Sequence, residues 1–207
     1  MFGMDATELL KNIRLMPVVV IDDDSRAVQL AETLLEAGIG AIEITLRTEQ
    51  ALAAIEQVAR AVPDIILGAG SIRNPEQFQS ISNAGAQFAV SPGHSKRLLE
   101  AANMPYLPGA VTPSECMDLL EHGYQLQKFF PAEQSGGLAK IKAMSAPLPE
   151  VRFCPTGGIT PELAVEYLAC AAVACIGGSW FVPGDALQAG DFKTIGALSR
   201  AAALLVE

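Results

Sequence analysis

The chain has 207 residues, of which 50% are hydrophobic and 18% charged, and it carries a formal net charge of -9. This size fits one domain, residues 1–207, with enough apolar residues for a large core. The acidic balance argues against a nucleic-acid or anionic-membrane partner, because either needs a basic face. The sequence has no apolar run of about 18 residues and no basic region ahead of an apolar one, so we expect a cytoplasmic protein.

The residues that most often bind metals are scattered. Four cysteines stand at positions 116, 154, 170 and 175 without a C-x-x-C pair, and we expect buried thiols rather than disulfides. His94 and His122 do not stand at metal-ligand spacing from each other or from the cysteines. The sequence therefore predicts neither a metal site nor a cofactor site.

Short β-forming apolar runs alternate with helical stretches along the whole chain, after an amphipathic start at residues 5–14. The predicted strands are residues 17–21, 39–45, 65–69, 86–91, 106–110, 125–130, 151–154 and 173–177. The predicted helices are residues 25–36, 49–62, 74–83, 95–103, 112–121, 136–144, 160–169 and 191–205.

Boundary signals support this alternation. Thr112 and Thr160 each precede a proline at a helix start, and Gly38, Gly85 and Gly123 each end a helix just before a strand. Eight βα units of this kind predict an α/β fold, a (β/α)8 TIM barrel with a short N-terminal helix. An open doubly wound sheet is the alternative, but it would leave two strand edges exposed.

Lys128 is a lone cation in the apolar, aromatic run of residues 125–130. Desolvating an ammonium is costly unless it is paired or loses its proton, and a neutral amine is the nucleophile that Schiff-base chemistry requires. The alternative is a lysine whose stem packs while its charged end reaches solvent.

Four other predicted strand ends carry chemically useful residues. In the second strand the two-residue period places Glu43, Thr45 and Arg47 on one side, so that a carboxylate and a guanidinium face the barrel mouth, either as site residues or as a salt bridge. The third strand ends in small residues followed by Ser71, which would let the backbone approach a ligand. Paired glycines follow the last two strands, where this fold commonly binds phosphate.

These motifs together resemble the 2-keto-3-deoxy-6-phosphogluconate (KDPG) aldolase family, which includes 4-hydroxy-2-oxoglutarate (KHG) aldolase. The resemblance covers essentially the whole chain. The residues that carry it are 43–48 (EITLRT), 68–70 (GAG), 91–93 (SPG), 128–133 (KFFPAE), 152–159 (RFCPTGGI) and 177–180 (GGSW).

The resemblance implies a role for each motif. Lys128 would form the Schiff base, Glu43 would transfer protons, and Arg47 with Ser71 would bind the pyruvate carboxylate. The family usually has threonine in place of Ser71, so the hydroxyl is kept and a methyl is lost. The remaining implied residues are the substrate-binding Pro92, Phe130 and Thr156 and the phosphate-binding Gly157, Gly158, Gly178 and Ser179. The family also forms homotrimers.

The predicted function is a class I aldolase that cleaves KDPG to pyruvate and glyceraldehyde 3-phosphate. KHG as the main substrate is one alternative. A phosphosugar isomerase or synthase without Schiff-base chemistry is another, since the same barrel hosts many reactions. A barrel that only binds a ligand would have no need of Lys128 and Glu43 at its mouth.

Overall fold

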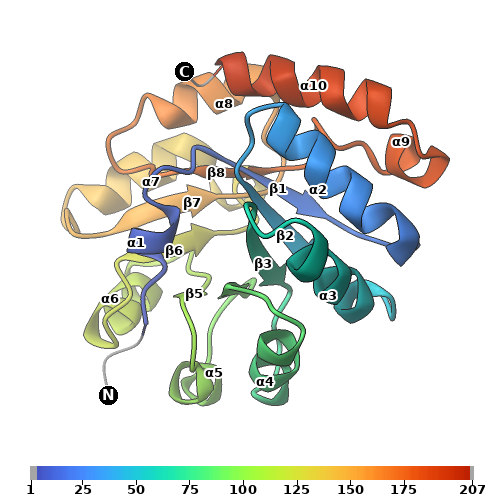
Figure 1. The fold of residues 1–207 in the computed structure, drawn as a ribbon. Helices are drawn as coiled ribbons and strands as arrows, with labels where there is room; N and C mark the ends of the chain where they lie inside the picture. Colours follow the sequence, from blue (N-terminus) through green and yellow to red (C-terminus); the bar gives the residue numbers. More distant parts are fainter. Residues whose placement is uncertain (1–3, 206–207) are drawn as a thin grey trace.

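The computed structural model describes residues 4–205 and shows parallel strands surrounded by helices (Figure 1). The strands are β1 (Leu15–Val19), β2 (Ala41–Thr45), β3 (Ile66–Gly70), β4 (Phe88–Val90), β5 (Tyr106–Leu107), β6 (Leu126–Phe129), β7 (Arg152–Pro155) and β8 (Ile176–Gly178). The helices are α1 (Thr7–Leu10), α2 (Ala27–Glu36), α3 (Ala51–Ala61), α4 (Glu76–Asn83), α5 (Lys96–Ala101), α6 (Pro113–Glu121), α7 (Gly137–Ser145), α8 (Pro161–Leu168), α9 (Gly184–Ala189) and α10 (Phe192–Leu205). Two 3-10 turns complete the fold, η1 (Asp24–Arg26) and η2 (Glu133–Ser135).

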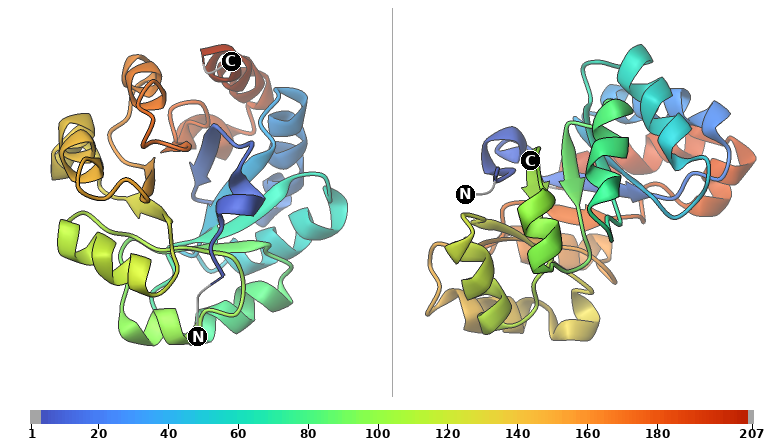
Figure 2. Two further views of the ribbon diagram at one scale, coloured as in Figure 1. Left: turned by 90° about the vertical axis from the view of Figure 1, so that its left-hand side faces the viewer. Right: turned by 90° about the horizontal axis from the view of Figure 1, so that it is seen from below.

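The strands form two parallel ladders that close into one barrel. The larger ladder has the order β5-β4-β3-β2-β1-β8, and β6 pairs only with β7. Isolated bridges join the ladders at Gly109 with Lys128 and at Thr156 with Gly177. In the left-hand view of Figure 2 the strands lie in the centre and the helices surround them. The predicted (β/α)8 barrel is therefore confirmed, and the open sheet is wrong.

The boundary signals act as the sequence predicted. The Thr112 side chain accepts a hydrogen bond from the Glu115 N–H, and the Glu115 carboxylate accepts from the Thr112 N–H, which is a capping box. Thr160 caps α8 through the Leu163 N–H. Each of the three predicted helix-ending glycines has a positive φ, between 85° and 92°, which suits a residue without a Cβ.

Several boundaries differ from the prediction. The helix α9 was missed because its six residues lie in a Pro- and Gly-containing segment without an N-cap side chain. The fifth strand is only Tyr106–Leu107, since Pro108 follows it and cannot donate a ladder hydrogen bond. The second helix begins at Ala27, because η1 takes up the preceding residues. Among residues 4–205, no helix is long and apolar enough to cross a membrane.

The core has two parts. One lies between the strands and the surrounding helices and contains most of the buried apolar side chains. The other lies inside the barrel and includes Leu10 of α1 and Ala6, which immediately precedes this helix. The Asp5 carboxylate accepts hydrogen bonds from the Gln125 and Leu126 N–H groups, which fixes α1 beside the start of β6. The N-terminal segment therefore fills the end of the barrel opposite the strand ends at which the sequence predicts chemistry.

The small residues of β3 serve the barrel interior, and the expectation that they let the backbone approach a ligand is wrong. A Cβ on Gly68 would lie 2.2 Å from the Phe88 ring. A Cβ on Gly70 would lie 2.0 Å from Oε1 of Glu43. Glycine at these two positions leaves room for the side chains that fill the barrel.

Candidate active site

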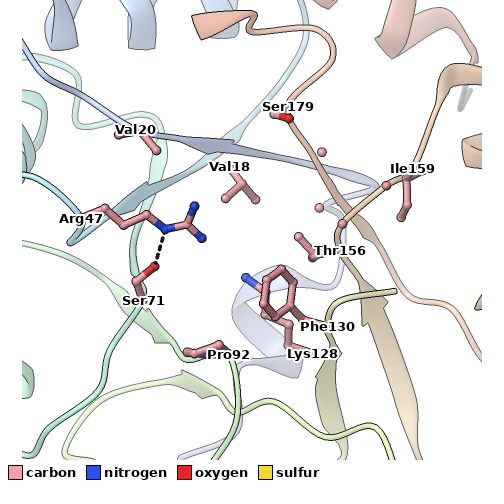
Figure 3. A pocket seen from close by; sticks show the side chains of 14 residues that line it. Val18, Val20, Arg47, Ser71, Pro92, Lys128, Phe130, Thr156, Ile159 and Ser179 are labelled. Atoms are coloured by element: carbon pink, nitrogen blue, oxygen red, sulfur yellow. Dashed lines mark hydrogen bonds between the residues drawn. The ribbon is translucent and has the colours of Figure 1, made fainter. Parts of the chain in front are cut away.

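A cavity of about 280 Å³ opens at the carboxyl ends of the strands (Figure 3). It collects side chains and backbone from β1, β6 and β8 and from the residues that follow β1, β2, β3, β4, β6, β7 and β8. Its lining residues are Val18, Val20, Arg47, Ser71, Pro92, Lys128, Phe130, Thr156, Gly157, Gly158, Ile159, Gly177, Gly178 and Ser179. This volume suits a small metabolite. The cavity thus gathers nearly every site residue that the sequence predicted.

Lys128 lies at the floor of the cavity and is only 5% exposed. Its Nζ donates to both carboxylate oxygens of Glu43, at 3.1 and 3.2 Å, and lies 5.6 Å from the centroid of the Phe130 ring. The alternative in which its head reaches solvent is therefore wrong. Removal of one partner of such a buried ion pair leaves an uncompensated buried charge, at a cost of about 3–5 kcal/mol.

Glu43 and Arg47 do not share one face at the mouth, in contrast to the prediction. Glu43 is 2% exposed and lies behind Lys128, outside the set of lining residues. The strand ends at Thr45, and Arg47 follows in a turn in which its N–H donates to the Thr45 carbonyl. The alternation of a strand applies only while the backbone is extended, so it cannot place Arg47.

Arg47 and Ser71 lie together at one side of the cavity (Figure 3). The Nε of Arg47 donates to the Ser71 Oγ at 3.1 Å, and none of the ion pairs among residues 4–205 involves Arg47. Its terminal nitrogens can therefore bind a carboxylate in a fork geometry. Ser71 has φ of 62°, a left-handed conformation that side chains adopt at a cost, and such strain gathers at functional sites.

Gly157 and Gly158 follow β7, Gly178 ends β8, and all three line the same cavity as Arg47. Gly157 and Gly158 have φ of 104° and 76°, conformations that favour glycine. A Cβ on Gly178 would lie 1.9 Å from the Trp180 ring, so this position has a packing reason as well. Ser179 is exposed at the cavity rim (Figure 3).

Thr156 has a hydroxyl without a full partner. The side chain is 6% exposed, and its Oγ1 makes no hydrogen bond to any of residues 4–205 under normal distance limits. The Cys154 thiol lies beside it, but a thiol is a weak acceptor.

A hydrogen bond with Cys154 and burial raise the pKa of the neighbouring Cys175 thiol well above its usual value. Cys175 is therefore an unreactive thiol in the barrel core.

The prediction that all four cysteines are buried thiols is correct for three. All four are free thiols, but Cys170 is only half-buried. His94 and His122 both contact Asp118, away from the cavity. Within the described part of the chain, no group of three or more metal-binding side chains gathers at one point.

Three lining residues were not predicted as site residues: Val18, Val20 and Ile159. Gly177 also lines the cavity and belongs to the second of the predicted glycine pairs. The signal for the two valines was present, because the two-residue period of the first strand places them on one face at its carboxyl end. In the sequence, apolar residues at a strand end cannot be distinguished from ordinary core residues, so the pattern alone does not assign the two valines to the cavity.

The structure places a buried lysine, paired with a carboxylate, at the floor of a cavity in the mouth of a (β/α)8 barrel. This is the arrangement of a class I aldolase, a carbon–carbon lyase that acts through a Schiff base. Comparison with known proteins agrees with this class. Residues 6–198 match the family model described as KDPG and KHG aldolase, and the chain belongs to this family.

Relatives and solved structures cover almost the whole chain. The KHG/KDPG aldolase of Escherichia coli (strain K12) is 46% identical over 200 residues, which are 95% of this chain and 94% of the relative. A structure of KDPG aldolase from Legionella pneumophila, with pyruvate captured as a covalent carbinolamine, is 42% identical with a TM-score of 0.91 and covers 94% of this chain and 96% of that one. KDPG aldolase of Zymomonas mobilis ZM4 with 3-phosphoglycerate is 39% identical with a TM-score of 0.89, covering 97% of this chain and 96% of that one.

Proposed function

We propose that this aldolase cleaves KDPG to pyruvate and glyceraldehyde 3-phosphate through a Schiff base on Lys128. The observation that carries the proposal is the buried Nζ of Lys128 at the cavity floor, 3.1 Å from Oε1 of Glu43. Transfer of one proton from Nζ to Glu43 yields a neutral amine, and the amine attacks the C2 ketone. Glu43 then gives this proton to the carbinolamine hydroxyl, which leaves as water, and the iminium that remains carries a positive charge that accepts electrons.

Glu43 moves the protons of the later steps. The C3–C4 bond breaks, its electron pair moves into the iminium to form an enamine, and the proton of the C4 hydroxyl passes to the Glu43 carboxylate. The aldehyde product leaves, the enamine carbon takes up a proton, and water hydrolyses the new iminium to release pyruvate. Glu43 is buried behind Lys128 and does not line the cavity. Its carboxylate can therefore exchange protons with Nζ and with the substrate atoms bound there, without occupying the space of the substrate.

The other cavity residues orient the substrate. Arg47 and Ser71 bind the carboxylate of the keto acid at one side. Pro92 and Phe130 contact its carbon chain, and Thr156 supplies a hydroxyl. The backbone N–H groups of Gly157, Gly158 and Gly178 and the hydroxyl of Ser179 bind the phosphate at the other side. The substrate then lies across Lys128, between two anion sites.

The covalent step is tested by borohydride reduction in the presence of pyruvate, followed by peptide mass spectrometry. We expect one adduct, on the peptide that contains Lys128. Lys128→Arg keeps the charge and loses the adduct, because arginine does not deprotonate usefully. Lys142→Arg is the matched control, since Lys142 is exposed on α7, and it should keep full labelling. An adduct on another lysine would refute the role of Lys128.

The choice of substrate is tested by kcat/KM for KDPG, its dephosphorylated form and KHG. A phosphate held away from the reacting carbons contributes binding energy that also orients the substrate. We expect KDPG to be preferred about 10²-fold, equivalent to about 2.7 kcal/mol. Ser179→Ala should remove only part of this preference. Equal values for the three compounds would favour KHG as the main substrate.

Two further properties extend the proposal. The family resemblance suggests a homotrimer, which sedimentation equilibrium of the purified protein tests directly. The cytoplasm is the compartment expected from the sequence, and fractionation of the source cells tests this.

A further inference from the structure

The loop after β7 turns two successive carbonyl groups toward η2. The Ala132 N–H donates to the Thr156 carbonyl at 2.8 Å, and the Glu133 N–H donates to the Gly157 carbonyl at 3.2 Å. A trans peptide bond places its C=O and N–H on opposite sides. The N–H groups of Gly157 and Gly158 are therefore turned away from η2, and within residues 4–205 they donate to no protein acceptor. Their direction depends on how firmly η2 is held.

The side chain of Glu133 supports this loop from behind. Its Cβ and Cγ both lie 2.9 Å from the point that a Cβ on Gly158 would occupy. Its Oε1 lies 3.2 Å from the corresponding point on Gly137, where α7 begins. Glu133 is half-buried and does not line the cavity. Its stem thus fills the space between the glycine loop and the start of α7.

Tyr167 fixes the end of this side chain. Its hydroxyl donates to Oε1 of Glu133, and the tyrosine itself is fully buried on α8. Burial, together with the hydrogen bond and charge of Glu133, raises the pKa of Tyr167, so the hydroxyl stays protonated and keeps donating. The helix α8 begins three residues after Gly158, and this contact ties it to η2, which the two backbone hydrogen bonds already join to the glycine loop.

We infer that Glu133 and Tyr167 form a positioning pair that sets the affinity of the cavity for the substrate phosphate. The pair holds the backbone donors of the glycine loop in place and keeps the negative charge of Glu133 on the far side of the loop. Without the tyrosine hydroxyl, the carboxylate has lost its fixed partner and can turn toward the loop, where it repels an anion. The inference rests on the proposed function, because it concerns the phosphate site of the same cavity.

The test compares KM for KDPG with KM for KHG, which carries no phosphate, in Tyr167→Phe, Glu133→Ala and Glu133→Gln. Tyr167→Phe and Glu133→Ala should raise KM for KDPG about tenfold, the usual effect of one such hydrogen bond, with kcat and the KM for KHG within about twofold of wild type. Glu133→Gln should stay near wild type, because its amide oxygen still accepts from the hydroxyl. The inhibition constant of inorganic phosphate should rise in parallel with KM for KDPG.

Tyr124→Phe is the matched control, because Tyr124 is also fully buried but its hydroxyl has no partner among the described residues. It should leave both KM values unchanged. An equal change of both KM values in Tyr167→Phe and Glu133→Ala would overturn the inference and leave the pair a purely structural contact, as would an unchanged KM for KDPG. If the wild-type enzyme still prefers KDPG over KHG, the proposed phosphate site is retained and only the inference about the pair fails. If the wild-type enzyme shows no such preference, both the phosphate site and the inference fail.

Discussion

Thr156→Val should make the free protein more stable and the enzyme less active. Valine has nearly the same shape as threonine and replaces the hydroxyl by a methyl. The Thr156 side chain is 6% exposed, and its Oγ1 finds no full partner within the described residues. A buried hydroxyl that is left unsatisfied costs about 1–3 kcal/mol, and the weak contact with the Cys154 thiol places this site at the lower end. A gain of about 1 kcal/mol raises the Tm of a chain of this size by about 2–4 °C.

We expect activity to move in the opposite direction, because Thr156 lines the cavity and we propose that its hydroxyl, which is buried in the free protein, turns toward bound substrate. Loss of one hydrogen bond to a substrate oxygen lowers kcat/KM by about tenfold. Differential scanning calorimetry of the free protein and steady-state cleavage of KDPG measure the two effects. Pyruvate trapping on Lys128 should persist, so the loss would lie in substrate contact rather than in the nucleophile.

Thr45→Val is the matched control for this prediction. The Thr45 side chain is fully buried, but its hydroxyl donates to the Val19 carbonyl at 2.9 Å, so its removal should lower Tm rather than raise it. A fall in Tm for Thr156→Val, together with unchanged kcat/KM, would refute the reasoning, since it would show that the hydroxyl already has a good partner in the free protein.

Three further predictions follow from particular contacts. Glu43→Gln removes the carboxylate from the buried ion pair and should lower single-turnover cleavage by about 10²-fold or more; an unchanged rate would make Glu43 only a salt-bridge partner. Gly70→Ala places a Cβ 2.0 Å from Oε1 of Glu43, so kcat should fall by at least about tenfold, whereas Gly184→Ala, which meets no atom within 4 Å, should match wild type in the same assay. For Glu115, burial acts to raise the pKa, but hydrogen bonds from two backbone N–H groups and the N-cap hydroxyl outweigh it and leave the pKa lowered. Its contribution to stability is therefore present above the pKa of the unfolded chain and is lost as pH falls through the folded pKa, so urea denaturation between about pH 5 and pH 3 should show a steeper loss for wild type than for Glu115→Gln.

The fold could be predicted because local signals and the repeat agree. Threonine caps, first-turn prolines and helix-ending glycines recur at a spacing that only a βα repeat explains, and each acts locally in the structure. The helix α9 has none of these signals: its N-cap is Pro183, without a side-chain bond, and its six residues are too few to show a period. Short elements of this kind are positioned by packing that the sequence does not display.

The site could be predicted where the chemistry is unusual for its place. Lys128 was found because a charge inside an apolar strand demands a partner, but the sequence could not name Glu43 as that partner, 85 positions away. The contact between Glu133 and Tyr167 was invisible for the same reason, since it joins two ordinary residues across 34 positions. Gly70 was misread because a glycine that admits a ligand and one that admits a side chain look alike in a sequence.

The residues of the active site come from both strand ladders of the barrel. Lys128, Gly157 and Gly158 belong to the β6–β7 side, whereas Glu43, Arg47, Ser71 and Ser179 belong to the six-stranded side. Within residues 4–205 the strand pairing across the two seams, between β5 and β6 and between β7 and β8, consists of isolated bridges. A substrate that is bound to Lys128, Arg47 and the phosphate residues would span both seams at once. Bound substrate would therefore connect the two ladders and oppose their local separation. Amide hydrogens beside Gly109 and Gly177 should exchange more slowly with solvent once substrate is bound.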